Sequence, residues 1–349
     1  RHQAVTRVSL CGHAQRVQWR ATMANKTPHF PRFLGIGAAR AGTTWLSKNL
    51  IAHPEVWIPR IKELHYFTRS AKYVGPSQLI DADPFKRLFS RAKPYRQYRH
   101  VASKAVASNI VRPSLRKLRW DANYLLRKPS DDWYKSLFAQ GYGKVTGEIT
   151  PRYSMLDAAD IRALKALIPD LKLIFIMREP VDRAWSLVKY HTKKYDGKRS
   201  ATTSLSALSA EELRRRAFAD VIGRQSNYEA ILERWRAVFP EEQLLEIFYD
   251  EISEQPDALM RRIQSFLGIQ VTGLPDSGTR QKVNGSFEEP IPDDLRAELI
   301  AHYGPMVARL SDAEGGYFTR WLDSYRLAPT SMPAVVAHSA GVSTETALP

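Results

Sequence analysis

The stretch that decides the fold is Phe33-Leu-Gly-Ile-Gly-Ala-Ala-Arg-Ala-Gly-Thr-Thr44. Its first five residues are apolar or glycine, which is typical of a buried strand that leads into a loop. Residues 43–52 then show helical spacing of their apolar side chains. His53-Pro54 ends this helix, because proline disfavours the helical conformation in the residue before it. The organised part of the chain therefore begins with a strand, a glycine loop and a helix.

The loop in this stretch is suited to binding a phosphate group. Gly37 and Gly42 are separated by four residues, as in a Walker A loop. Small residues there let backbone N–H groups converge on an anion, and the helix N-terminus adds partial positive charge. Thr43 stands where a Walker lysine is expected, and the nearby cation is Arg40. The loop thus favours a phosphorylated ligand other than ATP; a purely structural turn is the alternative.

A second candidate anion anchor follows the apolar segment Leu171–Met177, which we expect to be a buried parallel strand. Arg178 comes directly after it, at the strand end where open α/β sheets bind ligands. Ser186 lies eight residues further on, about two helical turns away, so its hydroxyl can face the same anion. Taken alone, Arg178 could equally pair with a structural acid.

The rest of the chain alternates strands with helices. This alternation predicts an α/β fold with a P-loop-like, doubly wound and mainly parallel sheet flanked by helices. The further segments are Lys144–Ile149 and Leu244–Tyr249 as strands, and Leu156–Leu167, the segment from Pro180 through Val188, Tyr228–Phe239 and Asp257–Leu267 as helices, the last closed by Gly268.

Positive charge is concentrated in one region. The whole chain of 349 residues has a formal charge of +16, and residues 84–130 hold 13 Lys or Arg against one acid, Asp121. Four prolines break this region into short pieces, so we expect a basic, mostly helical insert. Such a concentration of positive charge attracts anions, whether a nucleotide, an acidic glycan, nucleic acid or a membrane surface. A solvated basic face with no ligand is the alternative interpretation.

We expect one domain over residues 28–328, with disordered or non-native tails at 1–27 and 329–349. Met23 is a candidate natural start. No apolar run approaches the roughly 20 residues of a membrane helix, and no signal peptide is recognised. Cys11 is the single cysteine, so no disulfide can form within the chain. These features favour a reducing, cytoplasmic setting; oligomeric state is not readable from them.

Taken together, the motifs resemble the PAPS-dependent sulfotransferases, especially the bacterial and glycan-type members, over about residues 31–317. PAPS is 3'-phosphoadenosine-5'-phosphosulfate; the resemblance implies PAPS as co-substrate, PAP as product and no metal. It also implies an acceptor with a hydroxyl or amine, such as a carbohydrate or another anionic molecule. Four further segments fit the family: Lys62-Glu-Leu-His-Tyr-Phe67, Asp132-Trp-Tyr, Gly147-Glu-Ile-Thr-Pro-Arg-Tyr153 and Phe266-Leu-Gly268.

The resemblance also implies roles for individual residues. The loop after the first strand matches the family's site for the 5'-phosphosulfate, and Arg178 with Ser186 matches its site for the 3'-phosphate. Many members have lysine where this chain has Arg40; arginine keeps the charge but presents a planar fork instead of an ammonium. The implied donor-binding residues are Arg40, Ala41, Gly42, Thr43, Thr44, Trp45, Arg178, Ser186 and, in a late basic loop, Lys282, Asn284 and Gly285.

Two residues are candidates for the base that accepts the acceptor's proton. Glu63 matches the catalytic glutamate of the glycan-type members, and His65 is the second candidate because a neutral imidazole accepts protons near pH 7. Arg40 is the third expected catalytic residue, as the cation on the leaving group. Lys62 is expected to neutralise the transferring group, and Tyr153 to line a substrate pocket. A surface ion pair for Glu63 and core packing for His65 and Tyr153 are the alternatives.

Two other classes of protein are alternatives to a sulfotransferase. A nucleotide kinase needs the Walker lysine and a magnesium-binding acid at a strand end, where this chain has Thr43 and Arg178. A non-catalytic binder of nucleic acid or anionic membrane would use the basic insert, and stacking on bases needs exposed aromatic side chains. The insert offers Phe85, Phe89, Tyr95, Tyr98 and Trp120 for this. We expect nucleic-acid binding to be the weaker hypothesis.

Overall fold

The computed structural model describes residues 29–73, 79, 83–92, 95–111, 113–193, 205, 208–272, 274 and 289–327. The two predicted tails and the late basic loop with Lys282, Asn284 and Gly285 lie outside the described residues.

A five-stranded parallel sheet forms the centre of the fold, with strand order β2-β3-β1-β4-β5. β1 is the middle strand, and Phe33 is in register with Gly147 on one side and with Lys172 on the other. The chain fills the sheet on one side of β1 first and then crosses to the other side, so β1 and β4 form the topological switch point. The strands are β1 (Phe33–Gly37), β2 (Val56–Trp57), β3 (Val145–Ile149), β4 (Lys172–Met177) and β5 (Leu244–Phe248).

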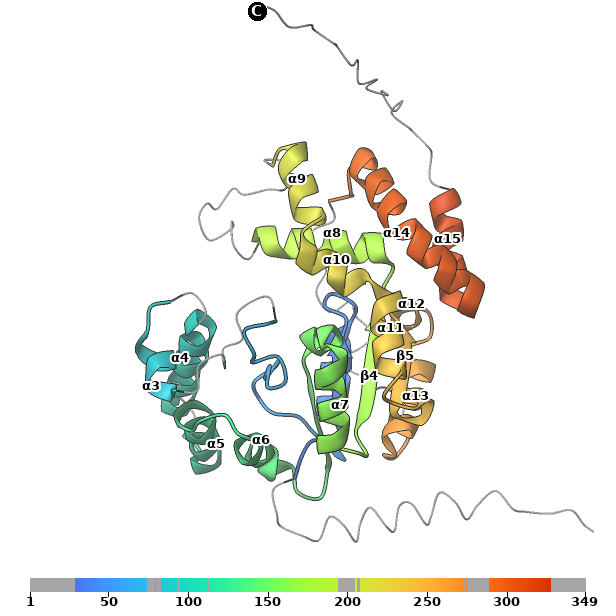
Figure 1. Cartoon of the computed structure of the whole chain (residues 1–349). Helices are drawn as coiled ribbons and strands as arrows, with labels where there is room; N and C mark the ends of the chain where they lie inside the picture. Colours follow the sequence, from blue (N-terminus) through green and yellow to red (C-terminus); the bar gives the residue numbers. More distant parts are fainter. Residues whose placement is uncertain are drawn as a thin grey trace, which may run out of the picture. The chain divides into compact units, whose positions relative to one another are not determined.

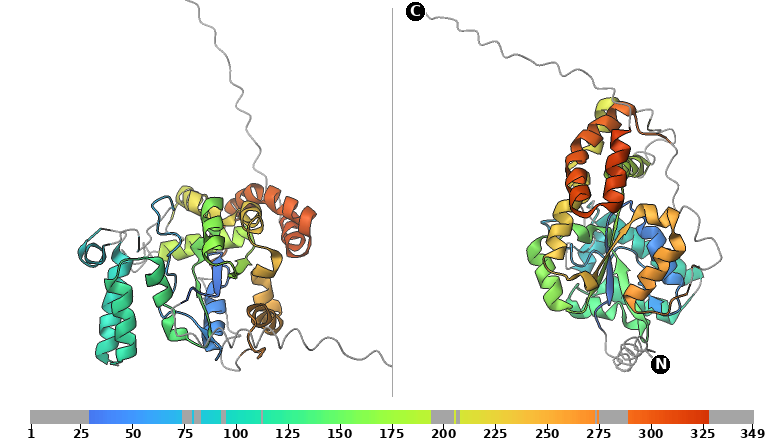
Figure 2. Two further views of the ribbon diagram at one scale, coloured as in Figure 1. Left: turned by 60° about the horizontal axis from the view of Figure 1, so that its bottom comes forward. Right: turned by 90° about the vertical axis from the view of Figure 1, so that its right-hand side faces the viewer.

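Helices cover both faces of the sheet, as the right-hand view of Figure 2 shows, with α2 and α13 on one face and α7 on the other. α8 begins where Glu179 accepts hydrogen bonds from the backbone N–H groups of Val181 and Asp182. The doubly wound sheet flanked by helices is thereby confirmed. The helices of this part of the chain are α2 (Thr43–Ala52), α7 (Ala158–Leu167), α8 (Pro180–His191), α9 (Ala210–Ala217), α10 (Asp220–Ser226), α11 (Tyr228–Arg236), α12 (Tyr249–Glu254) and α13 (Pro256–Leu267) (Figure 1).

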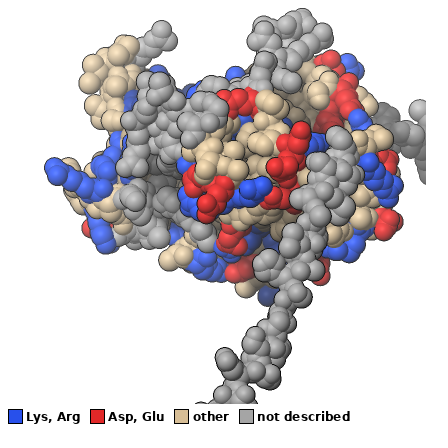
Figure 3. All heavy atoms as spheres, turned by 90° about the horizontal axis from the view of Figure 1, so that it is seen from above, with Lys and Arg blue, Asp and Glu red and all other residues tan. Residues whose placement is uncertain are grey.

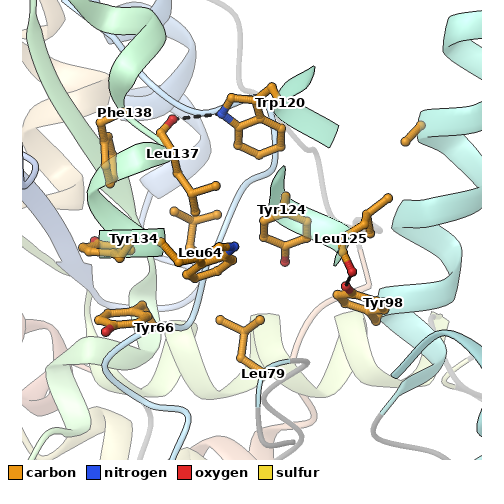
Figure 4. Packing of buried hydrophobic residues seen from close by; sticks show 12 residues of the cluster. Leu64, Tyr66, Leu79, Tyr98, Trp120, Tyr124, Leu125, Tyr134, Leu137 and Phe138 are labelled. Atoms are coloured by element: carbon orange, nitrogen blue, oxygen red, sulfur yellow. Dashed lines mark hydrogen bonds between the residues drawn. The ribbon is translucent and has the colours of Figure 1, made fainter. Parts of the chain in front are cut away.

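The described residues of the basic insert form α3 (Pro84–Phe89), α4 (Arg96–Val111) and α5 (Leu115–Leu126), followed by α6 (Asp131–Ser136). Its interior is an aromatic cluster (Figure 4), in which the Trp120 indole donates to Leu137 O at 2.8 Å and Tyr98 donates to Leu125 O. Tyr95, Tyr98 and Trp120 are buried, whereas Phe85 and Phe89 are exposed. Most of the aromatic side chains proposed for base stacking are therefore core residues.

The same cluster extends beyond the insert. Leu64 and Tyr66, which follow the predicted catalytic residue Glu63, pack within it, and the rings of Tyr66 and Tyr134 lie stacked with centroids 4.3 Å apart. Burial of large aromatic side chains contributes most to the stability of such clusters. The insert and α6 thus support the segment that was expected to hold the base.

Basic side chains lie on the insert's surface and, in one case, inside it. Figure 3 shows acidic and basic side chains interspersed on one face, with blue side chains along the edge where α3 to α5 lie. Arg87 is fully buried, however; its guanidinium donates to Arg127 O at 3.0 Å and lies over the ring of Tyr98. Arg87 therefore belongs to the interior of the insert and not to a solvated basic face.

Tertiary contacts divide the chain into two compact units between Glu289 and Pro290. The second unit contains α14 (Asp293–Glu314) and α15 (Gly316–Arg326), which pack against each other. A single domain over residues 28–328 stays a prediction.

Candidate active site

The loop after β1 has the backbone shape of an anion-binding turn. Gly42 adopts φ 94° at the start of α2, and an added Cβ there would meet the Ile252 side chain at 2.4 Å. Arg40 is also left-handed, with φ 68°, which is unusual for a residue with a side chain. No side chain caps the N-terminus of α2. The first N–H groups of a helix without such a cap are suited to a phosphate.

The second anchor lies beside this loop because β4 pairs directly with β1. Arg178 follows the last residue of β4, and its Nη1 donates to Arg40 O at 3.3 Å. Ser186 is buried on α8, and Arg40 Nε donates to its hydroxyl at 3.0 Å. The structure therefore brings the two anchors predicted from sequence into direct contact.

Three tyrosines that the sequence did not single out hold the arginines in place. The Arg178 guanidinium lies 4.6 Å from the ring centroid of Tyr249, and that of Arg40 lies 5.1 Å from Tyr190. The hydroxyl of Tyr228 bonds to the backbone of Arg178, accepting from its N–H at 3.1 Å and donating to its carbonyl at 2.7 Å. Burial raises the pKa of Tyr228 to about 12, so this hydroxyl stays protonated.

Lys62, Glu63 and His65 reach the same site from the segment after β2. Lys62 Nζ donates to the Thr44 hydroxyl at 2.9 Å, which joins this segment to the first turn of α2. Glu63 Oε2 lies 3.6 Å from His65 Nε2. His65 Nδ1 is 3.4 Å from the Thr68 hydroxyl. The two candidate bases are thus neighbours of each other.

Backbone strain marks the candidate catalytic residues. Among the described residues other than glycine, positive φ angles occur at Arg40, Glu63 and His65, with values of 68°, 62° and 57°. Each such residue costs on the order of 1–3 kcal/mol, and strain of this kind gathers at functional sites. These three residues are the ones that the sequence analysis expected to be catalytic.

The site has an excess of positive charge. Burial, and then the neighbouring Arg178, lower the pKa of Arg40. Burial lowers the pKa of Lys62, with Glu63 opposing and Arg40 adding to the shift, and burial and Arg178 lower that of Lys189. Cations that disfavour one another's charge indicate a site for a multiply charged anion. A donor with two separate phosphate groups fits this requirement.

Glu63 is poised as an ionised carboxylate. Its side chain is 38% exposed, so burial opposes the charge only in part. Burial alone would raise the pKa of Glu63, but the neighbouring His65, 3.6 Å away, and the charges of Lys62 and Arg152 hold it below its ordinary value. At neutral pH this group accepts a proton and does not donate one.

The remaining predicted residues lie in varied surroundings. Ala41, Thr43 and Trp45 are buried in the loop and on α2, and the N–H of Ala41 already donates to Ala38 O at 3.2 Å. Contact of these three residues with a ligand stays a prediction. Tyr153 is fully buried with its hydroxyl on Glu148 and Tyr66 N, which leaves no exposed surface to line a pocket. Contact of Tyr153 with a substrate stays a prediction.

Within the described part of the chain, no group of three or more His, Cys, Asp or Glu side chains has the arrangement of a metal site. The same part of the chain contains no helix that is both long and apolar enough to cross a membrane.

Comparison with known proteins agrees with the motifs. Residues 31–273 match the sulfotransferase family. Mouse (Mus musculus) heparan sulfate glucosamine 3-O-sulfotransferase 3B1 is 31% identical over 140 residues, 40% of this chain and 35% of the mouse protein. The bifunctional heparan sulfate N-deacetylase/N-sulfotransferase of Drosophila melanogaster is 24% identical over 252 residues, 69% of this chain and 20% of that protein. The chain thus spans only about a third or less of these relatives' length.

A solved structure shares the fold. The sulfotransferase from Alicyclobacillus acidocaldarius superposes with a TM-score of 0.55 at 25% identity, covering 84% of this chain and 99% of that one. The likeness therefore extends over nearly the whole of the bacterial protein.

Proposed function

This chain belongs to the sulfotransferase family, and from that membership we propose that it transfers a sulfuryl group from PAPS to a hydroxyl or amine of an anionic acceptor. One observation carries the proposal: the bond from Arg40 Nε to Ser186 Oγ joins the two anion anchors at 3.0 Å. Anchors at the ends of adjacent parallel strands suit one donor with phosphates at both its 5' and 3' positions.

We assign the donor's 5'-phosphosulfate to the loop after β1 and its 3'-phosphate to Arg178 and Ser186. The excess of positive charge at Arg40, Lys62 and Lys189 supports this assignment. Burial is the main cause of their lowered pKa values and repulsion from neighbouring arginines adds to it, and a bound anion would relieve that repulsion. Ring contacts from Tyr190 and Tyr249 fix the two guanidinium planes in advance. Such pre-organisation lowers the entropic cost of binding.

In the proposed reaction Glu63 accepts the proton of the acceptor hydroxyl or amine. The acceptor atom forms a bond to sulfur while the bond between sulfur and the 5'-phosphate oxygen breaks, and PAP leaves with the electron pair. Arg40 and Lys62 stabilise the negative charge that develops on the leaving oxygen. His65 orients Glu63, whose carboxylate lies 3.6 Å away.

The acceptor proposed is an acidic glycan. The basic insert supports this, because residues 84–130 contain 13 Lys and Arg residues and only one acidic residue, Asp121. The carboxylate of Asp121 is itself paired with Arg60 at 2.6 Å. Relatives named for heparan sulfate point in the same direction. Heparan sulfate is therefore the first acceptor to test. A cytoplasmic location is proposed on the sequence features alone.

Calorimetric titration with PAP in the absence of magnesium tests the donor site. Wild-type protein and Arg162→Ala, an exposed arginine on α7, should bind PAP alike. Arg178→Ala should lose roughly tenfold to a hundredfold in affinity, the usual worth of a charge-assisted hydrogen bond. ATP should bind weakly to all three. If well-folded wild type does not bind PAP, the two anchors do not form one site, and the hypothesis of a non-catalytic anion-binding protein moves forward.

A further inference from the structure

A buried carboxylate lies behind the candidate base and has no part in the chemistry described above. Glu148 is on β3, in register with Leu34 of β1, and is only 2% exposed. A carboxylate is costly to bury unless hydrogen bonds satisfy it. Its four donors, at 2.6–3.1 Å, are Tyr134 OH and Tyr153 OH on Oε1, and Thr150 Oγ1 and Leu64 N on Oε2.

Two of these bonds lead to the segment that contains Glu63 and His65. Leu64 N donates directly to Glu148 Oε2 at 3.1 Å. Tyr66 N donates at 2.9 Å to the hydroxyl of Tyr153, which in turn donates to Glu148 Oε1 at 2.7 Å. The backbone is thus tied to one carboxylate at the residue after Glu63 and at the residue after His65.

The residue before each of these two fixed N–H groups has a strained backbone. Glu63 and His65 have φ angles of 62° and 57°, in the left-handed region that side chains disfavour. Such conformations persist only where the surrounding structure imposes them. Glu63 directly precedes Leu64, and His65 directly precedes Tyr66, so each strained residue is followed by one whose N–H is held by a hydrogen bond.

We propose that Glu148 is the positioning residue of the catalytic base, holding the Glu63–His65 pair in its left-handed backbone through Leu64 N directly and through Tyr153 to Tyr66 N. The inference rests on the proposed role of Glu63 as base. It assigns a function to a glutamate that does not reach the reacting atoms, and it explains why the strand position holds a carboxylate. Glutamine cannot replace it, because the amide nitrogen would face two of the four donors.

Two tyrosines provide a matched pair of variants. Tyr134 and Tyr153 are both fully buried and both donate to Oε1 of Glu148, at 2.6 and 2.7 Å. Only the Tyr153 hydroxyl also accepts a bond from the backbone of Tyr66. Tyr153→Phe therefore removes one tie to the segment, whereas Tyr134→Phe removes a bond to the same carboxylate oxygen and leaves both ties. The ring of Tyr134, stacked on Tyr66 (Figure 4), is kept in phenylalanine.

Amide hydrogen exchange, followed by NMR, measures how firmly the N–H groups of Leu64 and Tyr66 are hydrogen-bonded. In the wild type the amides of Leu64 and Tyr66 should be protected. Glu148→Gln should lose about tenfold or more in protection at both amides, Tyr153→Phe at Tyr66 alone, and Tyr134→Phe at neither. Equal losses in the two phenylalanine variants, or unprotected amides in the wild type, overturn the proposal. The tyrosine pair decides the question even where Glu148→Gln fails to fold.

Titration of the Glu63 side-chain carboxyl by ¹³C NMR, assigned with Glu63→Gln, measures the position of the base. In Glu148→Gln and Tyr153→Phe the pKa of Glu63 should rise toward its ordinary value, because the carboxylate is no longer held beside His65. Tyr134→Phe should leave it unchanged. A general loss of stability would not separate the two phenylalanine variants in this way.

Turnover with PAPS and heparan sulfate separates this proposal from the proposed function. Tyr153→Phe should lower kcat about tenfold or more with PAP affinity unchanged, and Tyr134→Phe should stay within about twofold of wild type. Absence of any transfer by the wild type defeats the proposed function but leaves the two NMR tests standing. Transfer that needs Glu63 yet survives intact in Tyr153→Phe and Glu148→Gln overturns the positioning role.

Discussion

Arg40 Nε donates to the hydroxyl of Ser186 at 3.0 Å, across 146 positions of sequence. The bond connects the loop after β1 with α8, which follows the neighbouring strand β4. It also turns the cation of the loop toward the residue expected to bind the donor's 3'-phosphate. In the proposed assignment, Arg40 therefore lies next to the sites of both phosphate groups of the donor.

Ser186→Ala should weaken PAP binding by roughly tenfold, because a hydrogen bond to a charged phosphate is lost. Adenosine 5'-phosphosulfate, which has no 3'-phosphate, should bind the variant and the wild type equally well. Isothermal titration with both ligands checks this. An equal loss for both ligands would show that Ser186 acts on the loop through Arg40 and not on the 3'-phosphate.

Gly42→Ala should abolish measurable PAP binding. Its φ of 94° is unfavourable for alanine, and the new Cβ would meet the end of the Ile252 side chain at 2.4 Å, so either this side chain or the loop has to shift. Gly143→Ala is the control, since Gly143 has φ 76° but no atom within 4 Å. Both variants should lose about 1–2 kcal/mol of stability from the left-handed backbone. Calorimetry and thermal unfolding together distinguish the two effects; normal PAP binding by Gly42→Ala would contradict the loop assignment.

Glu63→Gln should lower kcat by about 10²–10⁴-fold, the usual contribution of a general base, with PAP affinity unchanged. A base works when deprotonated, so the rate is lost as pH falls through its pKa. Because His65 and the charges of Lys62 and Arg152 hold the pKa of Glu63 below its ordinary value, wild-type activity should stay level from neutrality down to about pH 5. Loss of activity between pH 8 and 6 would instead indicate a histidine base.

Charge reversal of Arg116, Lys117 and Arg119 on α5 should raise KM for heparan sulfate about tenfold or more, since the field that attracts the anion is weakened. PAP affinity should not change. The effect should shrink as salt is added, because these exposed charges are screened. Reversal of the same number of charges outside the insert, at Arg214, Arg215 and Arg224, is the control. An unchanged KM would remove the insert from acceptor binding.

Glu148 should make the free energy of unfolding depend on pH in the direction opposite to an ordinary ion-paired carboxylate. Burial raises its pKa in the folded protein, although Tyr134, Tyr153 and Thr150 donate to it and oppose the shift. The contribution of a group with a raised folded pKa is fully present below the unfolded pKa and is lost as pH rises through the folded one.

Urea unfolding at about pH 4.5 and 7.5 checks this dependence. The stability advantage of the wild type over Glu148→Gln should be larger at the lower pH. An advantage that grows with rising pH would mean that the four hydrogen bonds outweigh burial and that the folded pKa is lowered.

Local sequence determined much of the framework. α2 spans Thr43–Ala52 as predicted, and the predicted strand at Leu171–Met177 is β4, Lys172–Met177. Helices and buried strands of this length are set by side chains a few positions apart, which the sequence displays directly. The two-residue strand β2 and the helices α6, α9, α10, α12, α14 and α15 were not predicted, and Tyr249, predicted to end a strand, begins α12. Val56–Trp57 is too short to show any periodicity.

The chain's own motifs also predicted that the two proposed anion anchors and the Glu63–His65 pair belong to one site, because glycine spacing and family motifs can be recognised in consecutive residues. Tyr190 could have been found, because it lies one helical turn after Ser186 on α8. The evidence for Tyr249 in the sequence was weaker: it directly follows β5, and any residue at the carboxyl end of a parallel strand is a candidate for ligand binding.

Only the tertiary structure decided which distant residues meet. β1 lies between β3 and β4, so the phosphate loop contacts Arg178 from one neighbouring strand, while Glu148 comes from the other. Leu64 and Glu148 are 84 residues apart, and no local pattern predicts their bond. A buried carboxylate needs several donors at once, and only the packed sheet, α6 and the segment after β2 together bring them within reach.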